Sequence, residues 1–369
     1  MTTRKRPLRM AVVGQGHFAQ VAVLPGIDQL KDVEIAALVS DHPHKLEELG
    51  ERYRVAHRVG YADYDALVDS GDIDAVYIAL PPDLHADYAI RALRRGVHVL
   101  CEKPMAPTEE ECLAMIAAAE ESGAKLMIAY RLHFEPGNLA AVEMIKKGEL
   151  GEPRVFDSLF SMQVRDGNIR VQPRDGAGPL FDIGIYCVNA ARYLFREEPD
   201  QVVATRLDNP SDPRFQHVPE AFAVSLRFPA GQVASFVCSF GASDCSWYQV
   251  AGTEARLELD NAYEYVSGKT LTVVRDGKRR NKTFRRRDQI AAEVAYFAQC
   301  VRTGAEPEPS GYEGLADVRI LLAIQRSAES GHAVVVEPVR RDRRPDRGQE
   351  VSVAPHGKPE LVDVEAASE

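Results

Sequence analysis

Short apolar runs and amphipathic segments alternate along the first third of the chain. The apolar runs are typical of strands in a parallel sheet, whose two faces are both covered. They lie at 10–13, 33–39, 75–80, 97–101 and 125–130. Segments with helical periodicity separate them, at 18–30, 43–53, 64–70, 86–95 and 109–122. Thr108 and Glu111 match a capping box at the start of the last helix. This alternation predicts βαβ units and an α/β domain over residues 1–130.

After residue 130 the pattern changes to longer strands in which apolar and polar positions alternate. Such strands, joined by Gly, Pro and Asp turns, predict a large, mostly antiparallel open sheet. They are expected at 155–164, 201–207, 222–228, 233–240, 248–251 and 255–259. Helices are expected at 136–147, 181–194, 289–301 and 311–330, with a last strand at 333–337. We therefore predict an α+β domain over residues 131–338 that binds substrate and mediates oligomerisation.

Two charged regions are expected outside the core. Residues 339–369 are charged, contain Pro and Gly and show no periodicity, which predicts a flexible tail. The basic runs 278–280 and 285–287 follow a strand-like segment at 270–275. We interpret these runs as a solvated hairpin or edge strand in preference to a polyanion site.

Composition and charge narrow the possible functions. With 369 residues, 45% hydrophobic and 27% charged, the chain resembles a globular protein of about two domains. No apolar run approaches the ~20 residues of a membrane span, and the N-terminus lacks the apolar part of a secretory signal. We therefore expect a cytoplasmic protein without a membrane partner. The net charge of −10 argues against nucleic acid as a partner. Six scattered cysteines predict reduced thiols and no metal site.

A glycine-rich turn follows the first predicted strand. The run Gly14-Gln15-Gly16-His17-Phe18-Ala19 fits G-x-G-x-x-A between a strand and a helix. The first glycine permits a tight turn, the second lets a pyrophosphate approach the backbone, and the small third residue allows close packing. Glycines also occur in ordinary turns, but the βαβ context favours a Rossmann dinucleotide site. The expected cofactor contacts in this turn are Gly14, Gly16, His17 and Phe18.

The end of the second predicted strand bears on the choice of cofactor. Asp41 is suited to the ribose 2′-hydroxyl of NAD, whereas Ser40 and Lys45 together are suited to the 2′-phosphate of NADP. Asp41 is also placed to cap the following helix. The residues alone leave NAD and NADP open.

Two further motifs add a family resemblance. Cys101-Glu102-Lys103-Pro104-Met105 follows one apolar strand, and Ala79-Leu80-Pro81-Pro82-Asp83-Leu84-His85 ends the strand before it. Together with the glycine turn they resemble the glucose-fructose oxidoreductase/inositol dehydrogenase (Gfo/Idh/MocA) family. The resemblance implies a Rossmann domain, an NAD(P) cofactor and hydride transfer to or from a sugar or sugar-like polyol. It also implies further cofactor contacts at Leu80, Pro81, His85, Glu102, Lys103, Arg131 and Arg170.

The glucose-fructose oxidoreductase branch is the most similar. The segments 130–136 and 182–189 resemble that branch, which has Tyr where the wider family usually has His, here Tyr186. The branch uses NADP and has Ser and Lys at the positions of Ser40 and Lys45, so the resemblance implies NADP, with NAD possible. We expect neither the export signal nor the N-terminal arm over the cofactor that the glucose-fructose oxidoreductase has, and Ile169-Arg170 stands where the family often has Trp-Arg.

Alcohol oxidation needs a base for the hydroxyl proton and a cation for the developing alkoxide. On the resemblance we assign Tyr186 as the acid–base, Lys103 as its cationic partner and Asp182 as the group that orients Lys103 or the substrate. Asp182 and Tyr186 lie four residues apart and share one helix face. Without the resemblance, Tyr186 would be interpreted as a half-buried helix tyrosine and Lys103 as an exposed lysine. Arg131 and His133 are either sugar contacts or a polar pair in a loop.

Two other functions remain open at this stage. Some relatives use the bound cofactor transiently to cleave a glycosidic bond, and a non-catalytic dinucleotide sensor would need the glycine turn alone. The combination of Lys103, Asp182 and Tyr186 argues against a sensor. The open sheet face predicts a homodimer or homotetramer.

Overall fold

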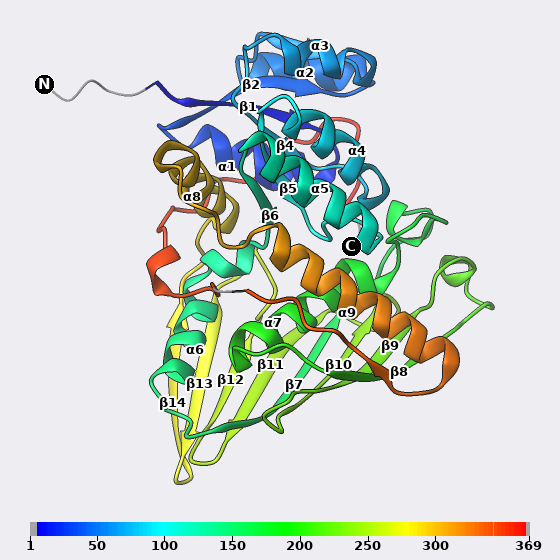
Figure 1. Ribbon diagram of the computed structural model, residues 1–369, viewed down its shortest axis with the longest axis vertical. Helices are drawn as coiled ribbons and strands as arrows, with labels where there is room; N and C mark the ends of the chain where they lie inside the picture. Colours follow the sequence, from blue (N-terminus) through cyan, green and yellow to red (C-terminus); the bar gives the residue numbers. More distant parts are fainter. Residues whose placement is uncertain (1–5, 342, 367–369) are drawn as a thin grey trace, which may run out of the picture.

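Two β-sheets organise the protein, one in each half of the chain (Figure 1). The computed structural model describes residues 6–341 and 343–366. Residues 1–5 of the expected first domain, and residues 342 and 367–369 of the expected tail, lie outside this description.

The first sheet has six parallel strands in the order β3-β2-β1-β4-β5-β6. This is the strand order of a Rossmann domain, and it confirms the predicted fold. The strands are β1 (Leu8–Val13), β2 (Val33–Val39), β3 (His57–Val59), β4 (Ala75–Ile78), β5 (His98–Glu102) and β6 (Leu126–Ala129). β3 was not predicted, because it is a three-residue edge strand without an apolar run.

Helices cover both faces of the first sheet. They are η1 (Ala19–Val23), α1 (Leu24–Asp28), α2 (Pro43–Arg52), η2 (Tyr61–Asp63), α3 (Tyr64–Asp69), α4 (Pro82–Leu93) and α5 (Glu109–Ser122). The segments η1, α1 and α2 share one core cluster, and α3, α4 and α5 pack in the other. Thr108 caps α5 as predicted, since its side chain accepts a hydrogen bond from the amide of Glu111.

One helix of the second half belongs to the first sheet. α8 (Gln289–Thr303) places Ile290, Val294 and Phe297 in the same core cluster as α1 and β1. This packing differs from the contiguous division at residue 130, because periodicity shows that a helix has an apolar face but not which sheet that face covers.

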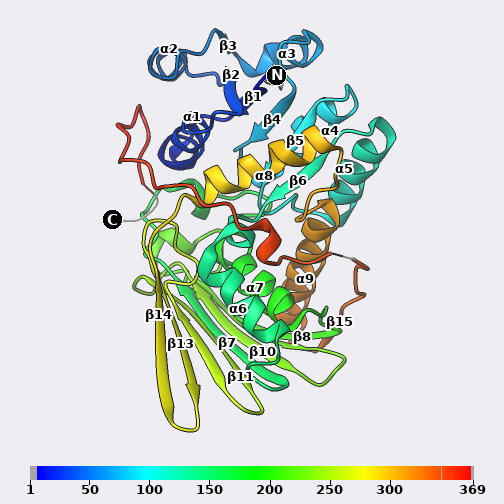
Figure 2. The same ribbon diagram turned by 90° about the vertical axis from the view of Figure 1, so that its left-hand side faces the viewer.

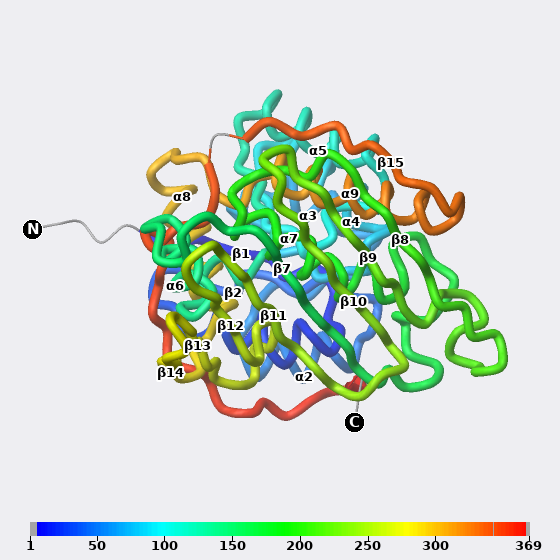
Figure 3. The backbone as a smooth tube through the Cα atoms, turned by 90° about the horizontal axis from the view of Figure 1, so that it is seen from below, coloured from blue at the N-terminus to red at the C-terminus, as the bar shows by residue number. Residues whose placement is uncertain are grey.

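The second sheet has nine strands in the order β14-β13-β12-β11-β7-β10-β9-β8-β15, and only the pair β7–β10 is parallel among them. Figure 3 shows its strands side by side. The mostly antiparallel prediction is thus confirmed. The strands are β7 (Pro153–Ser161), β8 (Gln201–Leu207), β9 (Ala221–Arg227), β10 (Val233–Ser239), β11 (Cys245–Gly252), β12 (Arg256–Asp260), β13 (Lys269–Arg275), β14 (Lys278–Phe284) and β15 (Val334–Val335). β14 is an exposed edge strand that carries the first basic run, as expected.

The remaining helices pack against the second sheet or lie in its connections. They are η3 (Arg131–Phe134), α6 (Pro136–Lys146), η4 (Ile169–Val171), η5 (Leu180–Gly184), α7 (Ile185–Phe195), η6 (Pro213–Phe215), α9 (Gly311–Ser330) and η7 (Arg347–Gln349). The predicted helix 181–194 therefore begins as one π-helical turn before α7.

In the described part of the chain, no helix is both long and apolar enough to cross a membrane. All six cysteines are free, and five of them are buried.

The segment after Val339 differs from the flexible tail that its composition predicts. It runs past α8 (Figure 2), and its residues Glu360 and Val362 form hydrogen bonds with α2 and η1. Arg341 donates a hydrogen bond to Glu198 at 2.8 Å, and Val362 is buried in the core cluster of the first sheet. These anchors are tertiary contacts, so the local sequence pattern did not reveal them.

Candidate functional site

The glycine turn lies at the carboxyl edge of the first sheet, between β1 and β4. Gly14 has a φ of +93°, and a Cβ there would lie 2.6 Å from the carbonyl oxygen of Ala79. The position therefore excludes other residues. A Cβ on Gly16 would meet no atom within 4 Å, so this backbone stays accessible. The turn has the shape that a dinucleotide pyrophosphate requires.

The next two residues of this turn face the second half of the chain. Phe18 packs edge-on against Tyr265, with ring centroids 5.9 Å apart. Burial lowers the pKa of His17, and the positive charge of Arg170 lowers it further. The structure thus brings the predicted cofactor residues His17, Phe18 and Arg170 to one region.

The loop after β2 and the start of α2 contain the three residues that bear on the choice between NAD and NADP as cofactor. Ser40 is buried, and its hydroxyl accepts a hydrogen bond from the amide of His42 at 3.2 Å. Asp41 accepts a hydrogen bond from the backbone amide of Tyr61 at 2.8 Å, so one of its carboxylate oxygens binds the segment that follows β3. Lys45 is mostly buried in the first turn of α2, and burial lowers its pKa. The Asp41 contact is an additional role that the sequence did not predict.

The loops after β4 and β5 are joined by His85. Its ring nitrogens lie 2.9 Å from the carbonyl oxygen of Pro104 and 2.8 Å from that of Leu80. The side chain is fully buried and both nitrogens are engaged, so His85 positions these loops instead of contacting a cofactor. This placement corrects its expected role. Glu102 also has structural partners, since it accepts the hydroxyl of Tyr77 at 2.6 Å, and burial raises its pKa.

Asp182 joins two cations at the boundary between the two sheets. Its Oδ1 accepts a hydrogen bond from Lys103 Nζ at 3.1 Å, and its Oδ2 accepts one from Arg170 Nε at 2.7 Å. Burial opposes ionisation of this carboxyl, but Arg170 and Lys103 hold its pKa well below the usual range. Lys103 Nζ also donates to the Asp182 carbonyl at 2.6 Å. The predicted pairing of Lys103 with Asp182 is present in the structure, and Arg170 pairs with Asp182 as well.

Tyr186 lies one helical turn after Asp182, with two cations over its ring. Lys103 Nζ and Arg131 Cζ each lie 4.8 Å from the ring centroid. Phe160 and Tyr263 pack around the same ring, with centroids at 5.7 and 6.1 Å. Burial disfavours the charged ammonium of Lys103, but Tyr186 and Asp182 outweigh it and raise the pKa of Lys103. Lys103 is therefore a stable cation beside the phenol.

Arg131 and His133 have partners that differ from the sequence expectation. Arg131 is buried and donates to Gln289 Oε1 at 2.7 Å and to the Tyr263 carbonyl at 2.6 Å. Its guanidinium is thus a second fixed cation at Tyr186 and not a free cofactor ligand. His133 is also buried, and its Nε2 lies 2.8 Å from Asn189 Oδ1. It belongs to a structural network behind the site.

The role of Arg131 was missed because the sequence shows neither of its hydrogen-bond partners. Gln289 begins α8, and Tyr263 follows β12. Both residues lie more than a hundred positions away from Arg131 in the sequence. No local signal could have identified this pairing.

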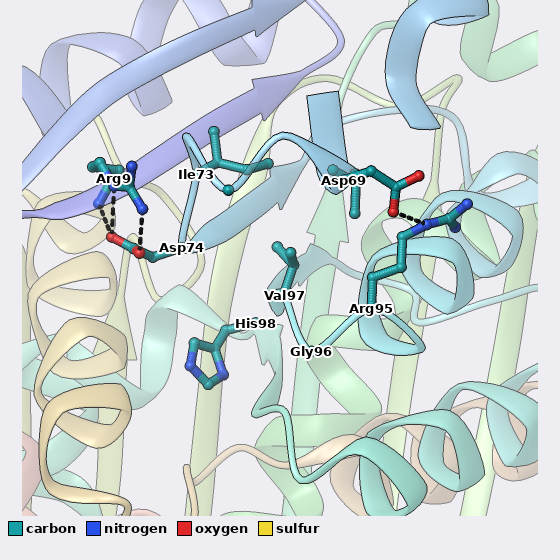
Figure 4. A pocket seen from close by; sticks show the side chains of 10 residues that line it. Arg9, Asp69, Ile73, Asp74, Arg95, Gly96, Val97 and His98 are labelled. Atoms are coloured by element: carbon teal, nitrogen blue, oxygen red, sulfur yellow. Dashed lines mark hydrogen bonds and ion pairs between the residues drawn. The ribbon is translucent and has the colours of Figure 1, made fainter. Parts of the chain in front are cut away.

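A separate cavity of about 420 Å³ lies at the opposite edge of the first sheet (Figure 4). Its cations are paired with carboxylates: Arg9 with Asp74 at 2.9 Å, and Arg95 with Asp69 at 2.7 Å. Ligands of open α/β sheets bind at the carboxyl ends of the strands. We therefore place the candidate site at Lys103, Asp182 and Tyr186 and not in this cavity.

Comparison with protein families gives two matches. Residues 8–130 match the model described as "Oxidoreductase family, NAD-binding Rossmann fold" (GFO_IDH_MocA). Residues 138–258 match the GFO/IDH/MocA C-terminal domain. The two matches together include the glycine turn, Lys103 and Tyr186.

Individual relatives agree with these matches. D-xylose 1-dehydrogenase (NADP(+)) 2 of Haloferax volcanii is 33% identical over 334 residues, which are 89% of this chain and 100% of that protein. The structure resembles an aldose-aldose oxidoreductase from Caulobacter crescentus complexed with glycerol, with a TM-score of 0.86, 37% identity and coverage of 90% and 100% of the two chains. It also resembles a 3-ketoreductase from Actinomadura kijaniata in complex with NADP and TDP-benzene, with a TM-score of 0.80, 27% identity and coverage of 87% and 98%.

Proposed function

Since this chain belongs to the Gfo/Idh/MocA family of oxidoreductases, we propose that it oxidises the anomeric hydroxyl of a free aldose with NADP as hydride acceptor. The membership confirms the predicted family and the prediction of an NAD(P)-dependent oxidoreductase. The observation that carries the proposal is the placement of Tyr186 beside Lys103, which is held by Asp182, at the carboxyl edge of the Rossmann sheet. A xylose dehydrogenase and an aldose-aldose oxidoreductase among the relatives support an aldose.

The residues at the sheet edge fit a dinucleotide. Gly14 and Gly16 leave the backbone of the turn open for a pyrophosphate, and the loop after β2 would hold the adenosine ribose. Ser40 and Lys45 would bind a 2′-phosphate, whereas Asp41 is already bonded to the neighbouring loop. This arrangement supports NADP over NAD, as do the NADP-dependent relatives.

Each residue of the trio has a separate task in the oxidation. A nicotinamide held at this sheet edge would supply the hydride acceptor for oxidation at C1 of the sugar. Tyr186 accepts the proton of the C1 hydroxyl, and Lys103 and Arg131 stabilise the phenolate and the developing alkoxide. Asp182 holds Lys103 and Arg170 in place and stays ionised throughout.

The charges around the trio favour a neutral sugar over a nucleotide sugar. A diphosphate group would need free Arg or Lys side chains. Arg170 and Lys103 are both bonded to Asp182, and Arg174 is paired with Asp83 at 3.0 Å. An uncharged aldose does not compete with these ion pairs.

The test compares aldoses with their methyl glycosides, which lack only the free anomeric hydroxyl. We expect NADP reduction with free D-xylose or D-glucose and none with the matched methyl glycoside. Equal rates with both, or with alditols, would contradict oxidation at C1. Sugar release from the glycoside without net NADP reduction would support the glycosidase alternative.

The open face of the second sheet supports self-association as a homodimer or homotetramer. Val155, Val203, Val233 and Val237 are 40–47% exposed on it. Val155 and Val233 are cross-strand partners, so these side chains share one face. Light scattering should give more than the monomer mass, and Val237→Lys should lower the measured mass. A monomeric wild-type protein would contradict the proposal.

The free cysteines support a reducing compartment, which we propose to be the cytoplasm.

A further inference from the structure

The C-terminal segment docks directly beside the dinucleotide turn. Gln20 lies in η1, four residues after Gly16, and is buried. Its side-chain amide donates to the carbonyl of Val362 at 2.9 Å and accepts the Val362 amide at 2.8 Å. The Val362 side chain is 7% exposed and packs in the core of the first domain. A paired hydrogen bond and a buried side chain together define a specific docking site for this segment.

This docking places Asp363 at the loop that we assign to the 2′-phosphate. Asp363 Oδ2 lies 2.7 Å from His44 Nδ1, in the first turn of α2. The hydrogen bond from His44 lowers the pKa of Asp363, and the charges of Lys45 and His42 lower it further. The carboxylate of Asp363 therefore pairs with His44, which lies next to Lys45 in the chain.

This segment follows the part of the chain that carries the family motifs. The aldose-aldose oxidoreductase structure and the Haloferax dehydrogenase are covered over 100% of their own length, yet they match only 90% and 89% of this chain. The family motifs end near Val336, and the segment from Val339 to Asp363 follows them. The carboxylate at this loop thus comes from a segment that lies beyond the family motifs.

We propose that Asp363 determines cofactor specificity by pairing with His44, the residue next to Lys45, so that the 2′-phosphate of NADP has to displace it. The inference rests on the proposed NADP site. A phosphate and a carboxylate repel each other and require the same cationic partners, so the two cannot share the loop without cost. NAD lacks the 2′-phosphate and leaves Asp363 in place. The C-terminal segment therefore lowers the affinity for NADP selectively.

The first experiment measures dinucleotide affinity of the full-length Asp363→Asn variant, with Glu365→Gln as the matched control. Glu365 is an exposed carboxylate two residues further along the chain. We expect Asp363→Asn to bind NADPH about 3- to 10-fold more tightly at low salt, with NADH unchanged, because the contact is solvent-exposed and screened. Glu365→Gln should change the ratio of NADPH affinity to NADH affinity less than Asp363→Asn does. No change in the NADPH/NADH ratio, or weaker NADPH binding, would overturn the proposal.

A second experiment separates this inference from the cofactor assignment. The Val362 amide is hydrogen-bonded to Gln20, so its hydrogen exchange reports whether the segment is docked. NADP should accelerate exchange there and NAD should not; equal exchange with both would contradict displacement. The assignment of Ser40 and Lys45 fails if wild-type protein binds NADH at least as tightly as NADPH and Lys45→Ala changes neither of these two affinities. If wild-type protein prefers NADPH but Asp363→Asn has no effect, only the role of Asp363 fails.

Discussion

Replacing Tyr186 by Phe removes one oxygen atom from the candidate site and retains the packing of the ring. The contacts with Phe160 and Tyr263 involve the ring and not the hydroxyl, and the cations Lys103 and Arg131 lie 4.8 Å from the ring centroid, which Phe retains. We therefore expect the free energy of unfolding to change by less than about 1 kcal/mol. NADP affinity should also stay near that of the wild type.

The rate of oxidation should fall much further. Loss of a positioned acid–base group typically lowers the rate ~10²–10⁴-fold, which corresponds to about 2.7–5.4 kcal/mol of activation free energy. Lys103→Met should be at least as damaging, because the phenolate and the alkoxide lose their cation. The double variant should be little slower than either single variant, because the two groups act as one unit.

The assay is steady-state aldose oxidation, with NADP affinity and thermal unfolding measured for every variant. Tyr193→Phe is the matched control, since Tyr193 lies on the same helix and its hydroxyl donates to Asn138 Oδ1 at 2.8 Å, away from the trio. The control should lose about 1 kcal/mol of stability and keep its turnover. Near wild-type turnover of Tyr186→Phe would refute the acid–base role and transfer it to Lys103.

Three further outcomes follow from the structure. Because Arg170 and Lys103 lower the folded-state pKa of Asp182, its ionised form stabilises the fold above the unfolded pKa of about 3.9. That stability is lost as the pH falls, so in acid titrations followed by circular dichroism Asp182→Asn should lose less stability than the wild type between about pH 5 and pH 2. Gly14→Ala should abolish dinucleotide binding in fluorescence titration, since its Cβ would lie 2.6 Å from the Ala79 carbonyl oxygen at a φ of +93°. Thr108→Ala should lower the free energy of unfolding in urea by about 1 kcal/mol, because the Glu111 amide loses its cap.

The sequence was sufficient for the elements that have strong local signals. The bounds predicted for β2, β8, α5 and α9 agree with the structure residue for residue. Long apolar or alternating runs and side-chain caps specify such elements locally. β3 was missed because three edge residues carry no periodicity. The packing of α8 on the first sheet was not predicted, because an apolar helix face does not identify its partner.

By itself, the sequence determined the Rossmann domain and the glycine turn, since both follow from local patterns, whereas Lys103, Asp182 and Tyr186 were assigned on the family resemblance. Only the tertiary structure decided that Arg131 is a second cation at Tyr186, that His85 is fully occupied by two carbonyls, and that the C-terminal segment reaches the loop after β2. These three features depend on contacts between residues that are far apart in the sequence and close together in the folded protein. Hydrogen bonding and burial set their roles, and no periodicity along the chain encodes such contacts.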